Sequence, residues 1–215
     1  MSDREPANIM NVVAFPEPDK AKRQIRFIDA EYNTVFTIPD GGSIVVTRMS
    51  GTSVVRACAY IDDYHTLVGD EVFHICQFAQ QAERAGAVYE PLAPEYTPAG
   101  GGTYEIYQID RVGAVDYTFM SYDRAKDALR ASDYQKVYAG VLAPSVTADR
   151  LYQRHNGDTR PFSSRMRALS VSDVLVLKRG GEKRAYYVDT VGFKEVPQFL
   201  RQHQQVKEAN ERFDQ

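Results

Sequence analysis

The sequence predicts an α+β protein built from two small domains, and three observations support this. Short runs rich in β-branched and aromatic residues recur through both halves of the chain, which is typical of strands. A Pro/Gly-rich stretch at residues 91–103 can form neither a helix nor a central strand. The net charge changes sign across this stretch, from −6 over residues 1–102 to +3 over residues 103–215. With 215 residues and 43% hydrophobic composition, the chain can bury a core in each half.

The first domain is predicted at residues 25–90, as a β-meander with one covering helix. Pro39–Gly42 provides turn residues for a hairpin between the second and third strands. Asp70 is predicted to cap a helix that begins at Glu71 and stops at Gly86, because apolar residues recur between them at helical spacing. The strands of the meander are expected at Ile25–Ile28, Thr34–Ile38, Ser43–Thr47 and Ser53–Ile61.

Two segments are predicted to lie outside the domains. Residues 1–24 contain three prolines and no sustained periodicity, which indicates a flexible N-terminal arm. Within this arm, Asn11–Phe15 is apolar enough to pair at a sheet edge. Residues 91–103 contain three prolines and three consecutive glycines and are predicted to be the interdomain linker.

The second domain is predicted at residues 104–215, with the element order β-α-β-α-β-β-α. Ser121 is the predicted cap of its first helix, Ser145 or Thr147 begins the second, and Pro197 opens the terminal helix. Two adjacent glycines supply the turn of a hairpin between the last two strands. The strands are expected at Tyr104–Ile109, Lys136–Leu142, Asp173–Lys178 and Lys183–Asp189.

The second half carries a combination of motifs shared with a known family. The most specific motif is Ser170–Val174, followed by a hairpin, by Tyr187–Asp189 and by Gly192–Phe193. The combination resembles the YodL-like domain found in proteins of Firmicutes plasmids, conjugative transposons and phages. The remaining segments that support the resemblance are Tyr104–Ile109, Val137–Gly140, Leu151–Tyr152, His155–Asn156 and Leu169–Leu177.

The first half resembles a small domain that accompanies the large polyvalent proteins of phages and conjugative elements. The segments that carry this resemblance are Tyr32–Gly42, Tyr60–His65 and Phe73–Phe78. Both resemblances imply that the protein belongs to a mobile genetic element. Neither resemblance brings an established catalytic motif. Domains of polyvalent proteins are commonly supposed to act early in a new host on host or defence factors, so the resemblance implies action by binding.

Two cysteines and nearby histidines are the residues with metal-ligand or nucleophilic chemistry. The chain has no C-x-x-C or H-x-x-x-H spacing, and the predicted helix would separate His74 and Cys76 by about 200° around its axis. A Cys-His hydrolase with Asp62 or Asp63 as the orienting acid needs contacts that the spacing does not establish. We therefore predict no metal ion, no cofactor and no catalytic residue. The residues considered are Cys58, His65, His74 and Cys76.

The serines of the family motif invite comparison with a catalytic nucleophile. Ser170 and Ser172 flank Val171 and stand beside Asp173, but no histidine has a defined relation to them. Serine hydroxyls also bond to main-chain groups where a chain changes direction. We therefore predict that the two serines shape the entry into the hairpin.

A basic segment and an acidic loop are the predicted partner contacts. Between Arg150 and Arg184, nine Lys/Arg stand against three Asp/Glu. Guanidinium groups suit bidentate contacts with phosphate or carboxylate, so this segment is predicted to bind an anionic partner surface or to contact the acidic first half. The predicted arginines are Arg160, Arg165, Arg167, Arg179 and Arg184.

The second predicted contact is a loop whose alternative role is structural. As a polar turn, it would use its aspartates to bond to nearby amides, and as a contact loop it would face a partner. The residues of this loop are Asp62, Asp63, Tyr64 and His65.

These observations lead us to expect a non-catalytic accessory binding protein of a phage or conjugative element that engages and modulates a host protein, with counter-defence inhibition as a specific form. A nucleic-acid-binding accessory factor that uses residues 150–184 is the second hypothesis, and an unrecognised hydrolase is the third. The chain has no run of roughly 18 to 20 apolar residues and no basic region leading into an apolar one, which predicts a cytoplasmic location without membrane contact. The oligomeric state is left open.

Overall fold

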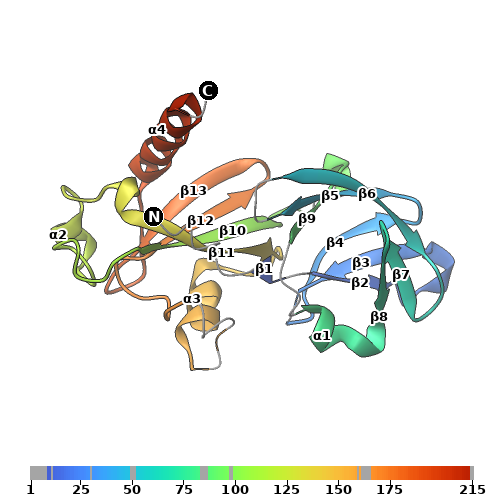
Figure 1. Cartoon of the computed structure of the whole chain (residues 1–215). Coiled ribbons are helices and arrows are strands. Elements are labelled where there is room, and N and C mark those ends of the chain that lie inside the picture. Colours follow the sequence, from blue (N-terminus) through green and yellow to red (C-terminus); the bar gives the residue numbers. More distant parts are fainter. Residues whose placement is uncertain are drawn as a thin grey trace. The chain divides into compact units, whose positions relative to one another are not determined.

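The structure is a computed structural model with a mixed α+β fold in which strands predominate (Figure 1). It divides into two compact units. The first contains residues 1–104, 139–146 and 179–181, and the second contains residues 105–138, 147–178 and 182–215. The residues that the structure describes are 9–10, 12–29, 31–48, 52–82, 87–96, 99–158, 160 and 166–213.

The first unit contains two antiparallel sheets. The smaller sheet has the strand order β2-β3-β4 and the larger has the order β8-β7-β6-β5-β9. In Figure 1, β2, β3 and β4 lie side by side as one sheet. The strands are β2 (Val13–Pro16), β3 (Gln24–Ile28), β4 (Thr34–Pro39), β5 (Ser43–Arg48), β6 (Ser53–Tyr60), β7 (His65–Val68), β8 (Glu71–His74) and β9 (Ala87–Pro91).

Side-chain alternation along these strands produces the core of the first unit. Phe27 of β3 is fully buried and stacks on Phe36 of β4, with ring centroids 4.4 Å apart. Phe27 also meets Tyr89 of β9, 6.3 Å away, so the two sheets share one core. The short helical segments of the first unit are η1 (Lys20–Lys22), η2 (Ile75–Gln77), α1 (Phe78–Ala82) and η3 (Pro94–Tyr96).

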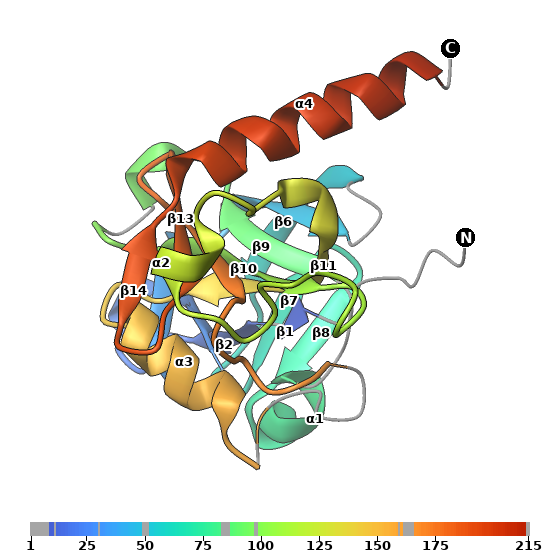
Figure 2. The ribbon, with the colours of Figure 1, turned by 90° about the vertical axis from the view of Figure 1, so that its left-hand side faces the viewer.

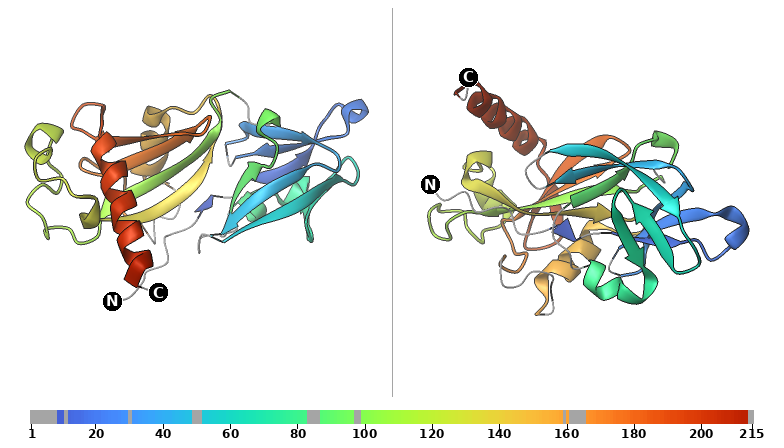
Figure 3. Two further views of the ribbon diagram at one scale, coloured as in Figure 1. Left: turned by 90° about the horizontal axis from the view of Figure 1, so that it is seen from above. Right: turned by 45° about the vertical axis from the view of Figure 1, so that its right-hand side comes forward.

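The helix predicted from Glu71 to Gly86 is wrong over its first part. Its first four residues form β8, which pairs with β7 as a hairpin with Val68 opposite Glu71 (teal in Figure 3, right). Gly69 and Asp70 are the loop, and Gly69 has φ +60°, a conformation that glycine adopts without strain. A Gly-Asp pair between two β-type runs is a hairpin signal, and here it prevails over the helix-cap interpretation of Asp70.

Strands β4 and β5, predicted to form a hairpin, belong to different sheets. The predicted turn exists, because the amide of Gly42 donates to the carbonyl of Pro39 at 3.0 Å. Asp40 inside this turn accepts from the amide of Tyr60 at 2.8 Å and pairs with Arg23 at 2.7 Å. The turn therefore carries the chain from one sheet to the other, and two sheets replace the predicted meander with one covering helix.

Regular structure extends into the predicted arm and linker. Val13–Pro16 pairs with β3 at the edge of the smaller sheet, as the apolar run of the arm predicted. Strand β1 (Ile9–Met10) runs parallel to Ala139–Gly140. In the predicted linker, Pro94–Tyr96 forms a 3-10 turn and the next strand already begins at Gly102. The parts of both segments outside the described residues are 1–8, 11, 97 and 98.

The third sheet has six strands in the order β1-β11-β10-β12-β13-β14. The second half contains the predicted element order with one additional short strand, β14, before the last helix. Its elements are β10 (Gly102–Ile109), α2 (Tyr122–Ala125), η4 (Ala131–Asp133), β11 (Tyr134–Leu142), α3 (Ala148–Asn156), β12 (Val174–Arg179), β13 (Glu182–Val188), β14 (Phe193–Glu195) and α4 (Pro197–Phe213).

The helix starts in this half are close to those predicted. Ser121 occupies the N-cap position of α2, but its side chain makes no capping hydrogen bond, and the α-helix ends at Ala125. Thr147, one of the two predicted starts, caps α3 by accepting from the amide of Arg150 at 3.2 Å.

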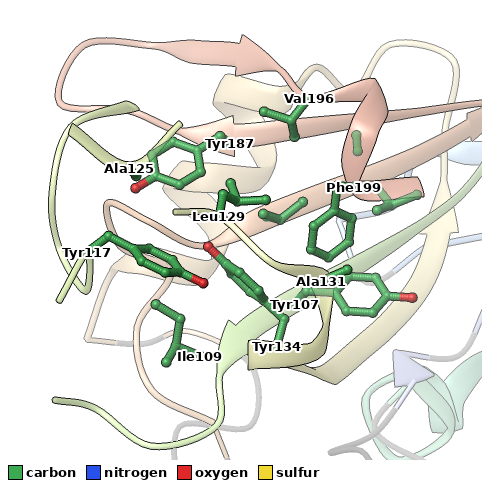
Figure 4. Close-up of a cluster of buried hydrophobic side chains, with 13 residues drawn as sticks. Tyr107, Ile109, Tyr117, Ala125, Leu129, Ala131, Tyr134, Tyr187, Val196 and Phe199 are labelled. Carbon is green, nitrogen blue, oxygen red and sulfur yellow. The ribbon is translucent and has the colours of Figure 1, made fainter. Parts of the chain in front are cut away.

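Aromatic side chains form the core on one face of the six-stranded sheet (Figure 4). Phe199 of α4 is fully buried and packs edge-on against Tyr107 and Tyr134, with ring centroids 5.3 Å from each. Gln202 of α4 accepts a hydrogen bond from the amide of Ala131 at 2.9 Å. The first turns of α4 are thus fixed to the second unit, and Figure 2 shows the helix continuing away from them.

No helix in the described parts of the chain combines the length and the apolar composition needed to span a membrane.

Candidate interaction site

The predicted contact loop connects two neighbouring strands, β6 and β7. A carboxylate oxygen of Asp62 accepts hydrogen bonds from the amides of Tyr64 at 2.8 Å and His65 at 2.9 Å. The same oxygen lies 2.8 Å from Nδ1 of His65. The amide of Ile61 donates to the carbonyl of His65 at 3.1 Å and closes the turn. The local structure is therefore a polar turn, although it joins two strands and not a strand and a helix.

Asp63 ties this loop to the segment that precedes β3. Its carboxylate pairs with Lys20 and accepts from the hydroxyl of Tyr60 at 2.8 Å. The hydrogen bond from Lys20 is the main reason that the pKa of Asp63 lies below its ordinary value. For Asp62, the amide of Tyr64 lowers the pKa most, followed by the His65 side chain. Both carboxylates are therefore charged at neutral pH and engaged within the loop.

Two apolar side chains of the loop project into solvent. Ile61 is 48% exposed and Tyr64 is 56% exposed. The bonds of Asp62 and Asp63 hold the backbone around them in one conformation. An exposed apolar pair on a fixed backbone is a suitable anchor for a partner protein, because little conformational entropy is lost when it is buried.

A histidine pair lies beside the loop, and the sequence analysis missed it because it placed His74 on a helix. His65 of β7 and His74 of β8 are direct cross-strand neighbours with ring centroids 4.4 Å apart. Nδ1 of His74 accepts from the amide of Cys76 at 3.0 Å, which puts the proton of the neutral ring on Nε2. In this tautomer, Nε2 of His74 carries a hydrogen and has no lone pair with which to bind a metal ion. Within the described residues, no group of three or more His, Cys, Asp or Glu could hold a metal ion.

The two cysteines occupy different environments. Cys58 is buried, and burial raises the pKa of its thiol to about 12. It therefore stays a neutral thiol at physiological pH and is a poor nucleophile. Cys76 is exposed.

The described arginines of the predicted basic contact surface have partners within the protein. Arg167 pairs with Asp173, Arg179 donates to the carbonyl of Val146, and the Nε of Arg184 donates to Glu182 at 3.0 Å. Arg160 donates to the carbonyl of Gly157 at 3.3 Å, and Arg165 lies outside the described residues.

These arginines also occupy separate places along the chain. Arg167 binds at the start of β12 through Asp173, whereas Arg179 is the last residue of that strand. A six-residue strand spans about 17 Å, so the two side chains belong to different ends of it. Arg167 and Arg179 therefore do not form one patch.

The family motif forms a buried polar cluster around Asp173. The carboxylate of Asp173 is fully buried and accepts from Arg167, from Gln108 at 3.0 Å and from the amide of Ser170 at 2.9 Å. Burial is the largest influence on this group and raises its pKa to about 6, against the opposing effect of Arg167. The guanidinium of Arg167 also lies under the ring of Phe119, 5.2 Å from its centroid.

The serines of the motif bind the main chain, as predicted. The hydroxyl of Ser172 accepts from the amide of Phe119 at 3.0 Å, and that of Ser170 donates to the carbonyl of Ala168 at 2.9 Å. The carbonyl of Ser172 in turn accepts from the hydroxyl of Tyr134 at 2.8 Å. These contacts give both serines structural roles.

The two parts of the family motif meet in space. The amide of Ser172 donates to the carbonyl of Val188 at 3.0 Å, and the amide of Val188 donates to the carbonyl of Asp173 at 2.8 Å. Next to Val188, the carboxylate of Asp189 accepts from the amide of Tyr122 at 3.0 Å. Sequence reasoning did not identify this attachment of the segment before α2, because the residues that make it are about 50 to 70 positions apart.

Residues 103–199 match the family model of the YodL-like domain, which confirms this part of the predicted resemblance. The match names no catalytic activity. It does not extend to residues 1–102, so the resemblance of the first half to domains of polyvalent proteins stays a prediction. The searches of curated proteins and of solved structures found no match.

Proposed function

We propose that this chain is a non-catalytic accessory binding protein that engages a host protein through the loop Ile61–His65. The setting, a phage or conjugative element, rests on the resemblances described above, and counter-defence inhibition is the specific form that we propose. The binding role rests on the geometry of the loop, in which Ile61 and Tyr64 are exposed while the carboxylates around them are bonded internally.

The chemistry of the candidate catalytic residues supports a binding role over a hydrolase. The serines of the motif are engaged with the main chain, and the buried Cys58 thiol is not ionised at neutral pH. His65 and Asp62 do form a histidine–carboxylate pair, but this pair also closes the turn, and the ring packs against His74.

The alternative of a nucleic-acid-binding factor receives less support. Phosphate binding requires arginine and lysine side chains that can exchange water and counterions for phosphate oxygens. Arg167 would first have to leave a buried carboxylate, and Arg184 would have to leave Glu182.

Affinity purification from a Firmicutes host lysate tests the proposal when wild type is compared with Ile61→Ser/Tyr64→Ser. Wild type should retain one stoichiometric protein after nuclease treatment of the lysate, and the double variant should lose it. The matched control is Val112→Ser/Val191→Ser, which alters two exposed apolar residues of the second unit, 60% and 87% exposed, and should retain the protein.

Loss of the captured protein upon nuclease treatment would transfer support to the nucleic-acid hypothesis. Equal capture by wild type and the loop variant would exclude the loop as the contact site. All three proteins should show the same urea midpoint, because the substituted side chains lie outside the cores.

A further inference from the structure

The outer face of the five-stranded sheet is apolar although it is exposed to solvent. Val45 of β5 lies opposite Val55 of β6, and Leu67 of β7 lies between Ala59 of β6 and Val72 of β8. Val55 is 54% exposed and Val72 is 49% exposed. The strands place these residues on the face opposite the core, since the residues that alternate with them include Cys58 of β6 and Phe73 of β8, which are buried.

This face is also depleted in charge, although the half that carries it is acidic. Residues 1–102 contain eight Lys/Arg and fourteen Asp/Glu, a net charge of −6. Among the described residues of the face, Glu90, opposite Val45, is the carboxylate and there is no Lys or Arg. The remaining members of the face are uncharged residues and two histidines, namely Ser43, Val45, Thr47, Ser53, Val55, Ala57, Ala59, His65, Leu67, Val72, His74 and Val88.

The surface relief of the face suits packing against another sheet. Ala57 and Ala59 form a low strip on β6 that continues onto β5 at Ser43, opposite Ala57. Larger aliphatic side chains border it at Val55, along the same strand, and at Leu67, on the next strand. Sheets pack face to face about 10 Å apart when the side chains of one enter the depressions of the other. In a two-fold dimer the same face of both copies meets, so raised residues of one copy can enter the low strip of the other.

The size of the face is near the lower limit of a specific interface. Five strands spaced about 4.8 Å apart, with a mean length of about 18 Å, give roughly 430 Å² of sheet area per copy. Two such faces bury about 860 Å², slightly below the roughly 1,000 Å² at which specific association begins. The expected complex is therefore weak and depends on concentration.

We propose that this face binds the same face of a second copy of the chain, forming a two-fold dimer with sheet against sheet. A second copy fits because the described part of the face carries a single carboxylate, Glu90, and no Lys or Arg, whereas an oppositely charged partner would find almost no charge there to pair with. The proposal does not depend on the function proposed above. Val55 lies six residues from Ile61 on an extended strand, about 20 Å away, whereas His65 belongs to both the face and the loop.

Sedimentation equilibrium of the full chain, from about 5 µM to about 500 µM protein, tests the dimer. Wild type should shift from monomer to dimer over this range. The dimer should tighten when NaCl is raised from about 0.05 M to about 0.5 M, because salt screens the repulsion between two acidic halves. A dimer held together by ion pairs would instead weaken as the NaCl concentration rises.

Val55→Glu should raise the dimer dissociation constant by at least about tenfold, because each copy would bury a carboxylate without a partner. Val72→Lys tests the other end of the face with the opposite charge and should act in the same direction. The control Val112→Glu makes the same change at a residue of the second unit that is 60% exposed, and it should dimerise as wild type does. A wild-type protein that stays monomeric throughout, or a dimer that both face variants leave intact, would overturn the proposal.

Discussion

Two non-glycine residues in the left-handed region, Phe119 and Ser172, are joined by one hydrogen bond. Their φ values are +62° and +79°, and the amide of Phe119 donates to the hydroxyl of Ser172 at 3.0 Å. This conformation costs an L-residue roughly 1 to 2 kcal/mol. The surrounding bonds compensate for this cost, with Tyr134 donating to the carbonyl of Ser172 and Tyr187 to that of Met120.

Ser172→Ala should destabilise the protein by about 1 to 2 kcal/mol, because it leaves the amide of Phe119 without its acceptor. Urea denaturation followed by circular dichroism measures this change. Ser170→Ala is the matched control, since it also removes one serine hydroxyl from the motif. Ser170 is half-buried whereas Ser172 is fully buried, so the loss of the Ser170 hydroxyl should cost less. An equal or reversed order would contradict the structural role of Ser172.

Asp173 should make stability depend on pH. Burial raises its pKa from 3.8 to about 6, so the folded state holds this proton more tightly than the unfolded chain does. The stabilisation is complete below about pH 4 and is lost as the pH rises through about 6. Lowering the pH from 7 to 4 should therefore stabilise wild type relative to Asp173→Asn by about 2 kcal/mol.

Urea denaturation at the two pH values checks this prediction, with the difference between the two proteins as the readout. Asp116→Asn, at an exposed position, should show no comparable difference. A difference between wild type and Asp173→Asn that grows towards neutral pH, in favour of wild type, would reverse the sign and contradict the prediction.

At the scale of elements, the edge strand β8 is covered by a side chain of α1. Gln81 is 1% exposed. In the amide orientation that satisfies both groups, it donates to the carbonyl of His74 and accepts from the amide of His74, both at 3.2 Å. The side chain thus takes the place of a neighbouring strand and blocks pairing with another chain at this point.

Gln81→Leu should destabilise the protein by about 1 to 3 kcal/mol, because the new side chain fills the space but leaves two main-chain groups of β8 without partners. Thermal and urea unfolding measure the loss. Gln80→Leu makes the same change at the neighbouring exposed position and should alter stability by less than about 0.5 kcal/mol. Equal stability of the two variants would exclude the proposed role of Gln81.

The sequence predicted most elements of the second half and fewer of the first for a physical reason. In the second half, alternation, helix caps and two adjacent glycines identify strands, helices and a hairpin from neighbouring residues alone. In the first half, residues 71–74 allow a helix or a strand, and only their pairing with β7 decides between them. The same holds for β4 and β5, whose turn is local but whose partners are β3 and β6.

The candidate site could be predicted only in part. The turn-forming role of Asp62 follows from the sequence Asp-Asp between strands, because short carboxylates bond to amides two or three residues ahead. The bond from Lys20 to Asp63 joins residues 43 positions apart, and no local pattern reports it. The ion pair between Arg167 and Asp173 also could not be predicted from a count of charged residues.

At the scale of the whole molecule, ion pairs within the fold engage part of the positive charge that distinguishes the second half from the acidic first half. The second half has a net charge of +3, but several of its basic side chains are paired, Lys136 and Lys183 with Glu105 among them. The surface therefore offers fewer unpaired basic side chains to a ligand than a count of the Lys and Arg residues suggests.

We expect no measurable binding of a 20-nucleotide single strand or duplex at about 10 µM protein and about 0.05 M NaCl. Fluorescence anisotropy of a labelled oligonucleotide provides the measurement. Micromolar binding that falls steeply with added salt, and that Arg160→Ala/Arg184→Ala weakens, would favour the nucleic-acid hypothesis over the one proposed here.

The sequence by itself determined the α+β class, the strand and helix periodicities of the second half and the YodL-like motif, because each depends on residues close together in the chain. The tertiary structure decided which strands become partners, which charges are neutralised and which apolar side chains remain outside. These depend on contacts between residues tens of positions apart. The free energy of such contacts comes from burial and pairing in three dimensions, which a linear pattern does not record.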